Sequence, residues 1–180
     1  MPTNIIDQLN QFYKKDQAEI KRLLKIFCQK VLFADFPELA TMASIVVTGS
    51  VSTNSFDKHS DIDLVIIFKT EKQQKKYKPL LMNKYKWGDS EVAQSKIEFH
   101  GMNIRFFKQL EEEVTGFKVD WRVFEYAHAM IISDPEKRFV QLMREYLLYP
   151  RNILNSKLRW LLQDAQYQLT IRDRKSTRLN

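Results

Sequence analysis

The chain is poor in cysteine and histidine and has no long hydrophobic run. Its single cysteine among 180 residues, Cys28, excludes an internal disulfide framework. The 3 histidines form no cluster with it, so a zinc site is not expected. No apolar run approaches the ~20 residues of a membrane-spanning helix, and the chain has no internal repeat. These absences favour a globular protein without a membrane partner, for which the cytoplasm is the expected location.

The first part of the chain has the hydrophobic pattern of amphipathic helices. Apolar residues recur largely every three or four positions, with lysines between them, at Ile5, Leu9, Phe12, Ile20, Leu23, Leu24, Phe27 and Val31. The pattern predicts one or two helices over residues 5–33 that pack on a sheet. Cys28 falls on their apolar side, which favours a buried thiol over a nucleophile. A hydrophobic content of 44% is enough for one core, with or without a helical extension.

A glycine-serine turn and a pair of aspartates lie between two short apolar runs. Residues 45–48 and 64–68 are rich in β-branched side chains, as in buried strands. The first run ends at Gly49-Ser50, and Asp61-Ile62-Asp63 opens the second after a polar spacer of ten residues. The order therefore predicts a strand, a turn and a second strand.

The residue types in this motif suit phosphate and a hard cation. Gly49 lets the backbone approach a ligand closely, and Ser50 offers a hydroxyl and an N–H to phosphate oxygens. Residues two apart on a strand share a face, so Asp61 and Asp63 project together. Mg²⁺ takes one or two carboxylates, waters and substrate phosphates, which implies phosphoryl or nucleotidyl transfer. The alternative is an ordinary turn followed by two solvent-facing aspartates.

These four residues, Gly49, Ser50, Asp61 and Asp63, resemble the signature of the DNA polymerase β-like nucleotidyltransferase superfamily, in its minimal and aminoglycoside-type branch. The resemblance implies an α+β fold in which a small mixed β-sheet has flanking helices and a partial helical C-terminal region. It also implies Mg²⁺-dependent transfer of a nucleoside monophosphate from ATP or another NTP to a hydroxyl, with release of pyrophosphate. Asp61 and Asp63 would then bind the metal, and Gly49, Ser50 and Ser60 would bind the nucleotide.

Members of this superfamily usually carry a third carboxylate, for which Glu98 is the candidate. Residues 96–107 alternate apolar and polar side chains around Gly101-Met102, which predicts a hairpin. In that register Glu98 faces Arg105, where many minimal members have an aspartate. Glu98 is interpreted as a catalytic residue, either the general base or a third metal ligand, or alternatively as the partner of Arg105 in a surface ion pair. Without it, the chain would have two acidic ligands, or be a catalytically inactive module that binds nucleotide or a partner.

A lysine-rich stretch, residues 69–78, predicts the start of a solvated helix that Pro79 ends. Its lysines, with Tyr77, Tyr85 and Trp87, also fit contacts to the phosphates and bases of nucleic acid. Glutamate and glutamine are mixed in, which favours the solvated helix face. The net charge of +7, from 29 Lys and Arg against 22 Asp and Glu, decides little, because positive charge is also expected near a triphosphate.

The last third of the chain is predicted to be helical. One helix is expected from residue 118 to Ile132, followed by a break at Ser133-Asp134-Pro135 in which Asp134 is a helix cap. Further helices are expected over residues 136–149 and after Pro150.

The resemblance, which covers about residues 40–107, and the helical pattern together suggest a division of the chain. We expect a nucleotidyltransferase domain at 1–117 and a helical C-terminal region at 118–172 that is truncated. Residues 173–180 resemble a translated sequencing adapter and are expected to be a non-native tail. The acceptor stays open between a small molecule, a protein hydroxyl and a tRNA end.

Overall fold

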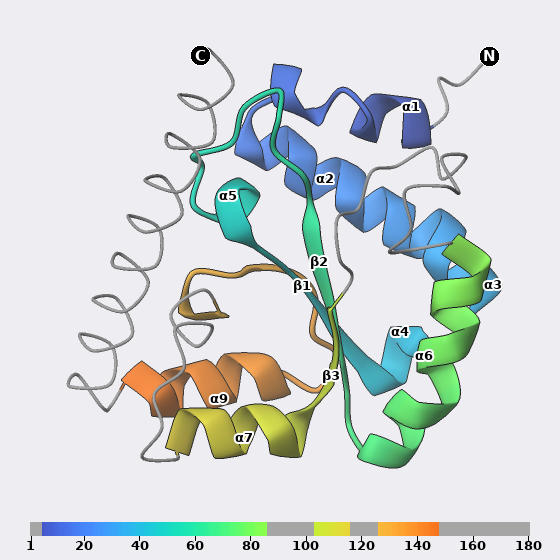
Figure 1. Ribbon diagram of the computed structural model, residues 1–180, viewed down its shortest axis with the longest axis vertical. Helices are drawn as coiled ribbons and strands as arrows, with labels where there is room; N and C mark the ends of the chain where they lie inside the picture. Colours follow the sequence, from blue (N-terminus) through green and yellow to red (C-terminus); the bar gives the residue numbers. More distant parts are fainter. Residues whose placement is uncertain (1–4, 86–102, 116–125, 148–180) are drawn as a thin grey trace, which may run out of the picture.

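A computed structural model describes residues 5–85, 103–115 and 126–147 (Figure 1). The helical segments in these ranges are α1 (Ile5–Leu9), η1 (Phe12–Lys14), α2 (Gln17–Phe27), η2 (Cys28–Leu32), α3 (Phe33–Asp35), α4 (Leu39–Met42), α5 (Gly49–Ser52), α6 (Glu71–Tyr85), α7 (Phe107–Thr115) and α9 (Arg138–Leu147). The strands there are β1 (Ala43–Thr48), β2 (Asp63–Phe68), β3 (Asn103–Phe106) and β4 (Met130–Ser133). None of these helices is long and apolar enough to cross a membrane.

The strands form a mixed sheet in the order β3-β2-β1-β4. β1 and β2 are antiparallel and pair from Ala43 with Phe68 to Thr48 with Asp63. β4 runs antiparallel along the other side of β1, whereas β3 lies parallel to β2. A small mixed sheet with flanking helices is the α+β fold that the sequence predicts, and this prediction is confirmed.

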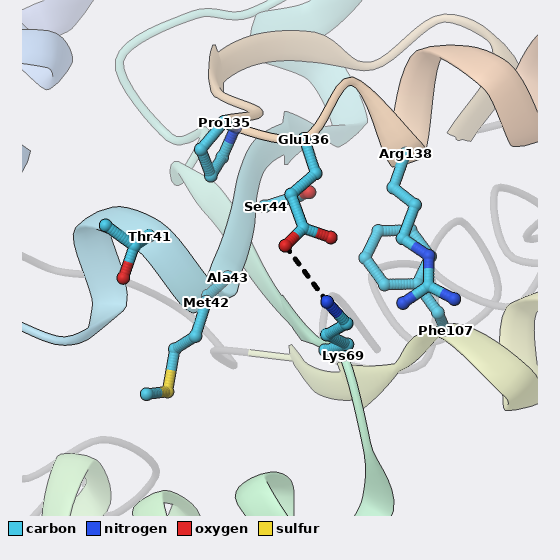
Figure 2. A pocket seen from close by; sticks show the side chains of 9 residues that line it. All are labelled: Thr41, Met42, Ala43, Ser44, Lys69, Phe107, Pro135, Glu136 and Arg138. Atoms are coloured by element: carbon cyan, nitrogen blue, oxygen red, sulfur yellow. Dashed lines mark hydrogen bonds and ion pairs between the residues drawn. The ribbon is translucent and has the colours of Figure 1, made fainter.

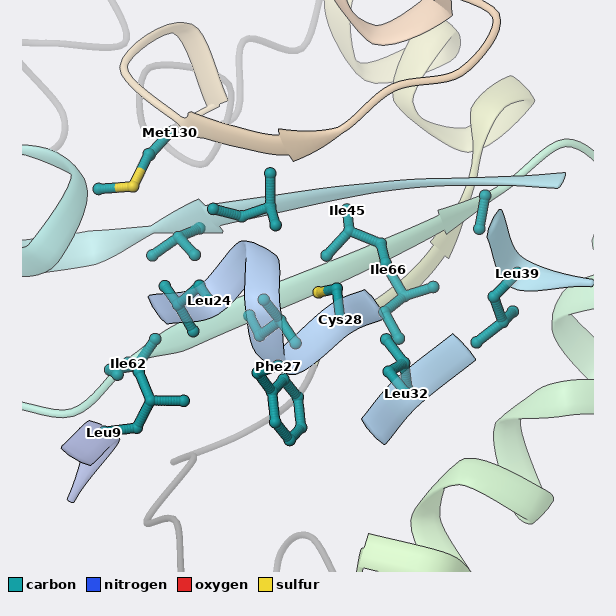
Figure 3. Packing of buried hydrophobic residues seen from close by; sticks show 14 of the residues in the cluster. Leu9, Leu24, Phe27, Cys28, Leu32, Leu39, Ile45, Ile62, Ile66 and Met130 are labelled. Atoms are coloured by element: carbon teal, nitrogen blue, oxygen red, sulfur yellow. The ribbon is translucent and has the colours of Figure 1, made fainter. Parts of the chain in front are cut away.

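Helices cover both faces of the sheet. Alternate residues of β1 and β2 enter two separate clusters of buried side chains, as the two-residue period of a strand requires. Ile45 and Ile66 lie on the side of the N-terminal helices, near Leu24 and Cys28 (Figure 3). On the opposite side, Val46, Val65 and Ile67 pack against α7 and α9, which lie side by side (Figure 1). The central strands are therefore buried on both faces.

The N-terminal helical region is divided into more segments than the periodicity predicts. α2 begins after Asp16, whose carboxylate accepts the N–H of Glu19 at 2.8 Å and caps the helix. The π-helix η2 then continues α2 directly. Cys28, at the junction, is 1% exposed, and its burial raises the thiol pKa to about 12. The prediction of a buried cysteine on the apolar side of these helices is confirmed.

The prediction that Pro79 ends its helix is wrong. α6 contains Pro79 and continues to Tyr85. Two buried side chains, Tyr77 and Leu81, fix the helix on either side of the proline, and the Tyr77 ring stacks on that of Phe68 with centroids 5.6 Å apart. Tertiary packing thus compensates for the hydrogen bond that proline cannot donate.

The predicted helix from residue 118 to Ile132 is also wrong at its end, because residues 130–133 form strand β4. Met130 pairs with Val47 and Ile131 with Val46 of β1. Two adjacent β-branched residues, Ile131 and Ile132, favour an edge strand over a helix. Residues 118–125 lie outside the described residues. The domain boundary between residues 117 and 118 stays a prediction.

Candidate active site

The glycine-serine turn lies at the end of β1, next to the first aspartate of β2. Thr48 is the last residue of β1 and pairs with Asp63, and α5 begins at Gly49. Gly49 has a φ of +70°, which side-chain-bearing residues rarely adopt. A Cβ atom at this position would also collide with Oδ2 of Asp63 and lie 3.2 Å from its Cγ. The fold therefore places the backbone of the turn directly against a carboxylate.

Asp63 lies where the two-residue period of a strand predicts, whereas Asp61 precedes β2, so its place on the same face stays a prediction. Ile62 and Leu64 are 1% and 0% exposed and belong to the core on the side of the N-terminal helices. Asp63 therefore points to the opposite side of the sheet, the side of Val65 and Ile67. Both aspartates are partly exposed, so solvent ions and phosphates can reach their carboxylates.

The spacer ends in a turn that holds Ser60 beside Asp57. The Ser60 hydroxyl donates to Oδ1 of Asp57 at 3.1 Å, and the Asp57 N–H donates to the hydroxyl oxygen at 2.9 Å. The His59 N–H also donates to Oδ1, and this bond is the main cause that lowers the pKa of Asp57. The turn leads directly into Asp61. The role of Ser60 in nucleotide binding stays a prediction, because its hydroxyl is engaged within the turn.

Gln17 also reaches this turn, which the sequence does not predict. Its side-chain amide donates to the carbonyl oxygens of Val51 and Ser52, at 2.9 and 2.8 Å. Within the turn, the Ser52 hydroxyl donates to the Gly49 carbonyl at 2.8 Å. No pattern in the sequence marks a glutamine 34 residues before its partner.

The third carboxylate, Glu98, lies outside the described residues, as does the first arm of its predicted hairpin. The second arm is β3, in which Ile104 joins the core on one face and Arg105 lies on the other, as predicted. Arg105 is 8% exposed, so an ion pair with Glu98 at this arginine would be buried and not on the surface.

The donor set fits a magnesium ion that keeps several non-protein ligands. Across residues 5–85, 103–115 and 126–147, no group of three or more His, Cys, Asp or Glu side chains is placed to hold a metal. Asp61 and Asp63 supply two hard carboxylate ligands, and Mg²⁺ commonly binds one or two carboxylates together with substrate phosphates and water. The chemistry of the pair therefore suits a metal that arrives with a nucleotide.

A small cavity lies at the opposite end of β1 (Figure 2). Its volume is about 10 Å³, room for about one water molecule. Among the lining residues, Lys69 and Glu136 form an ion pair of 3.0 Å, and the Arg138 guanidinium lies 5.2 Å from the centre of the Phe107 ring. None of the predicted site residues in the described part of the chain lines this cavity, which is too small for a nucleotide.

The described residues thus combine a mixed sheet with a glycine-serine turn that packs against the acidic start of the next strand. A family model described as nucleotidyltransferase domain matches residues 20–142. The chain therefore belongs to this family, which is part of the DNA polymerase β-like superfamily. The match extends beyond the resemblance expected over residues 40–107. No curated protein sequence matches the chain.

Proposed function

We propose that the protein is a Mg²⁺-dependent nucleotidyltransferase that moves a nucleoside monophosphate from ATP or another NTP to a hydroxyl. The contact between Gly49 and the Asp63 carboxylate is the observation that carries this proposal. It supports a site in which a phosphate-binding backbone and a metal-binding carboxylate act on the same substrate. Membership of the nucleotidyltransferase domain family supports the reaction class.

Each predicted site residue has a role in this proposal. Gly49 and Ser50 would hold the β- and γ-phosphates, with Ser60 beside them. Asp61 and Asp63 would hold Mg²⁺, which neutralises phosphate charge and polarises the phosphoryl oxygens.

The transfer is a displacement at the α-phosphorus of the NTP. The acceptor oxygen forms a bond to this phosphorus as the bond to the bridging oxygen breaks, so that pyrophosphate leaves with the electron pair. The proton of the acceptor hydroxyl passes to a general base, for which Glu98 is our candidate.

The acceptor is a small molecule, a protein hydroxyl or a tRNA end. The exposed lysines of α6 are compatible with the last of these, although the lysines at 75 and 84 already form ion pairs with Glu71 and Asp35. We propose the cytoplasm as the location, where NTPs and all three kinds of acceptor occur together.

Transfer of label from α-labelled ATP, CTP, GTP and UTP tests the proposal. Each nucleotide is incubated with Mg²⁺ and a cell extract, and the small molecules, RNA and protein are then separated. We expect label in one fraction with wild type and none with Asp61→Ala/Asp63→Ala. Asp7→Ala, at an exposed aspartate of α1, is the matched control and should retain activity.

A catalytically inactive module that binds nucleotide is the second candidate. The buried Arg105 on the neighbouring strand, where many minimal members of the superfamily have an aspartate, favours it. In that case wild type would bind ATP, measured by calorimetry, without labelling any fraction. Labelling that depends on Asp61 and Asp63 would exclude this candidate.

A further inference from the structure

The side chain of Gln17 connects the start of α2 to the carbonyl end of α5. Its amide nitrogen donates to the backbone oxygens of Val51 and Ser52, at 2.9 and 2.8 Å. The last carbonyls of a helix have no partner within that helix and need one from outside. Gln17 supplies this partner for the one-turn helix that begins with Gly49 and Ser50.

α5 depends on such outside contacts because a single helical turn is not stable by itself. Val51 is 0% exposed and anchors the turn in the core. The N-terminal region also holds the spacer, since the Phe12 ring contacts that of Phe56 with centroids 5.8 Å apart. The segment from Phe12 to Gln17 thus contacts the loop between Gly49 and Asp61 at two places.

Gln17 precedes the part of the chain that matches the family model, which begins at residue 20. We propose that Gln17 is a positioning residue, which keeps α5 in the conformation that presents Gly49 and Ser50 to the phosphates of the NTP. This inference rests on the proposed function. The amide acts through backbone carbonyls and does not touch the substrate.

The replacement Gln17→Met tests this inference, because methionine has nearly the same length and volume but no N–H group. Gln29→Met, at an exposed glutamine of η2, is the matched control. Two measurements are made on the full chain. The first is KM and kcat for the NTP. The second is hydrogen exchange, without nucleotide, at the amides of Thr53 and Ser55, which donate to the carbonyls of Gly49 and Ser50.

We expect Gln17→Met to raise KM about tenfold with kcat changed less than about twofold, since the loss of hydrogen bonds weakens nucleotide binding. The Thr53 and Ser55 amides should exchange about tenfold faster, while those of α9 exchange as in wild type. Gln29→Met should change neither measurement.

Unchanged exchange at Thr53 and Ser55 would overturn the inference. Equally faster hydrogen exchange in the turn and in α9 would also overturn the inference, because such a result would indicate general destabilisation. A wild type without transfer activity would contradict the proposed function alone, since the exchange measurement still decides whether Gln17 holds the turn.

Discussion

Gly49 is constrained twice, by its backbone conformation and by its neighbour Asp63. A positive φ costs a side-chain-bearing residue about 1–2 kcal/mol. The collision with the Asp63 carboxylate is a separate constraint, because it depends on the side chain of another strand. The backbone conformation of the turn and the neighbouring Asp63 carboxylate therefore each require a glycine at position 49.

We expect Gly49→Ala to lower the free energy of unfolding and abolish nucleotidyl transfer, because the new methyl group displaces the carboxylate. Urea denaturation should show a loss of about 1–2 kcal/mol from φ and about 1–3 kcal/mol from overpacking. In an Asp63→Ala background, where the carboxylate is absent, only the loss from φ should remain. Equal losses in the two backgrounds would show that the carboxylate does not constrain position 49.

Cys28 should be unreactive in the folded protein. Burial raises its pKa from 9.0 to about 12, and the thiolate is the reactive form. The folded state therefore holds this proton more tightly than the unfolded state, so the contribution of Cys28 to stability is complete below pH 9 and decreases as pH rises towards 12. With a thiol reagent at pH 8, we expect no reaction in buffer and one thiol per chain in urea. Rapid reaction in buffer would contradict the buried position.

Asp134 joins two elements that are distant in the sequence. Its carboxylate accepts the backbone N–H groups of Phe139 and Val140, at 3.3 and 3.1 Å, and so caps α9, as the sequence predicts. The same carboxylate accepts the hydroxyl of Ser44, a buried residue of β1, at 2.6 Å. One side chain thus fixes the start of a helix against the sheet.

Asp134→Ala is expected to lower the free energy of unfolding by about 1 kcal/mol for the cap and about 1 kcal/mol for the hydroxyl left without its acceptor. Asp134→Asn keeps an oxygen acceptor and should lose less. Chemical denaturation measures both variants, alone and with Ser44→Ala. Losses that are strictly additive with Ser44→Ala would contradict a direct Ser44–Asp134 bond.

Pro79 lies at an exposed position inside α6, where its ring prevents one helical hydrogen bond. Pro79→Ala supplies the missing N–H and should stabilise the protein by about 1–3 kcal/mol. The thermal midpoint, compared with that of the neighbouring exposed variant Lys78→Ala, measures the effect. A lower midpoint for Pro79→Ala would show that the packing of Tyr77 and Leu81 needs the proline.

Sequence patterns predicted an element correctly where the neighbouring elements favour the same secondary structure as its own residues. The β-branched runs around the glycine-serine turn predicted β1 and β2, because burial on both faces leaves short, continuous apolar stretches. The same patterns failed at β4, where pairing with β1 decides between strand and helix. They also could not show Gln17 beside α5, since that contact depends on how α2 crosses the sheet.

The helices on the two faces of the sheet pack on the same strands, β1 and β2. The two layers should therefore unfold together. Ile66 and Ile67 are neighbours in β2 but belong to the cores on opposite faces. Ile66→Val and Ile67→Val should each cost about 0.5–1.5 kcal/mol. Each variant should accelerate hydrogen exchange equally in α2, on one face, and in α9, on the other. Acceleration confined to the helix on the mutated face would show that the two layers open independently.

The pairing of β1 with both β2 and β4 has a consequence for the order of folding. β2 follows β1 after a short loop, whereas Ser44 and Asp134 are 90 residues apart. Closing the shorter loop costs less chain entropy, so the hairpin with Gly49 and Asp63 is expected to form early. During synthesis, this hairpin leaves the ribosome well before β4 does. The nascent chain thus holds its glycine-serine turn beside Asp63 while the other side of β1 is still open to a chaperone or to another strand.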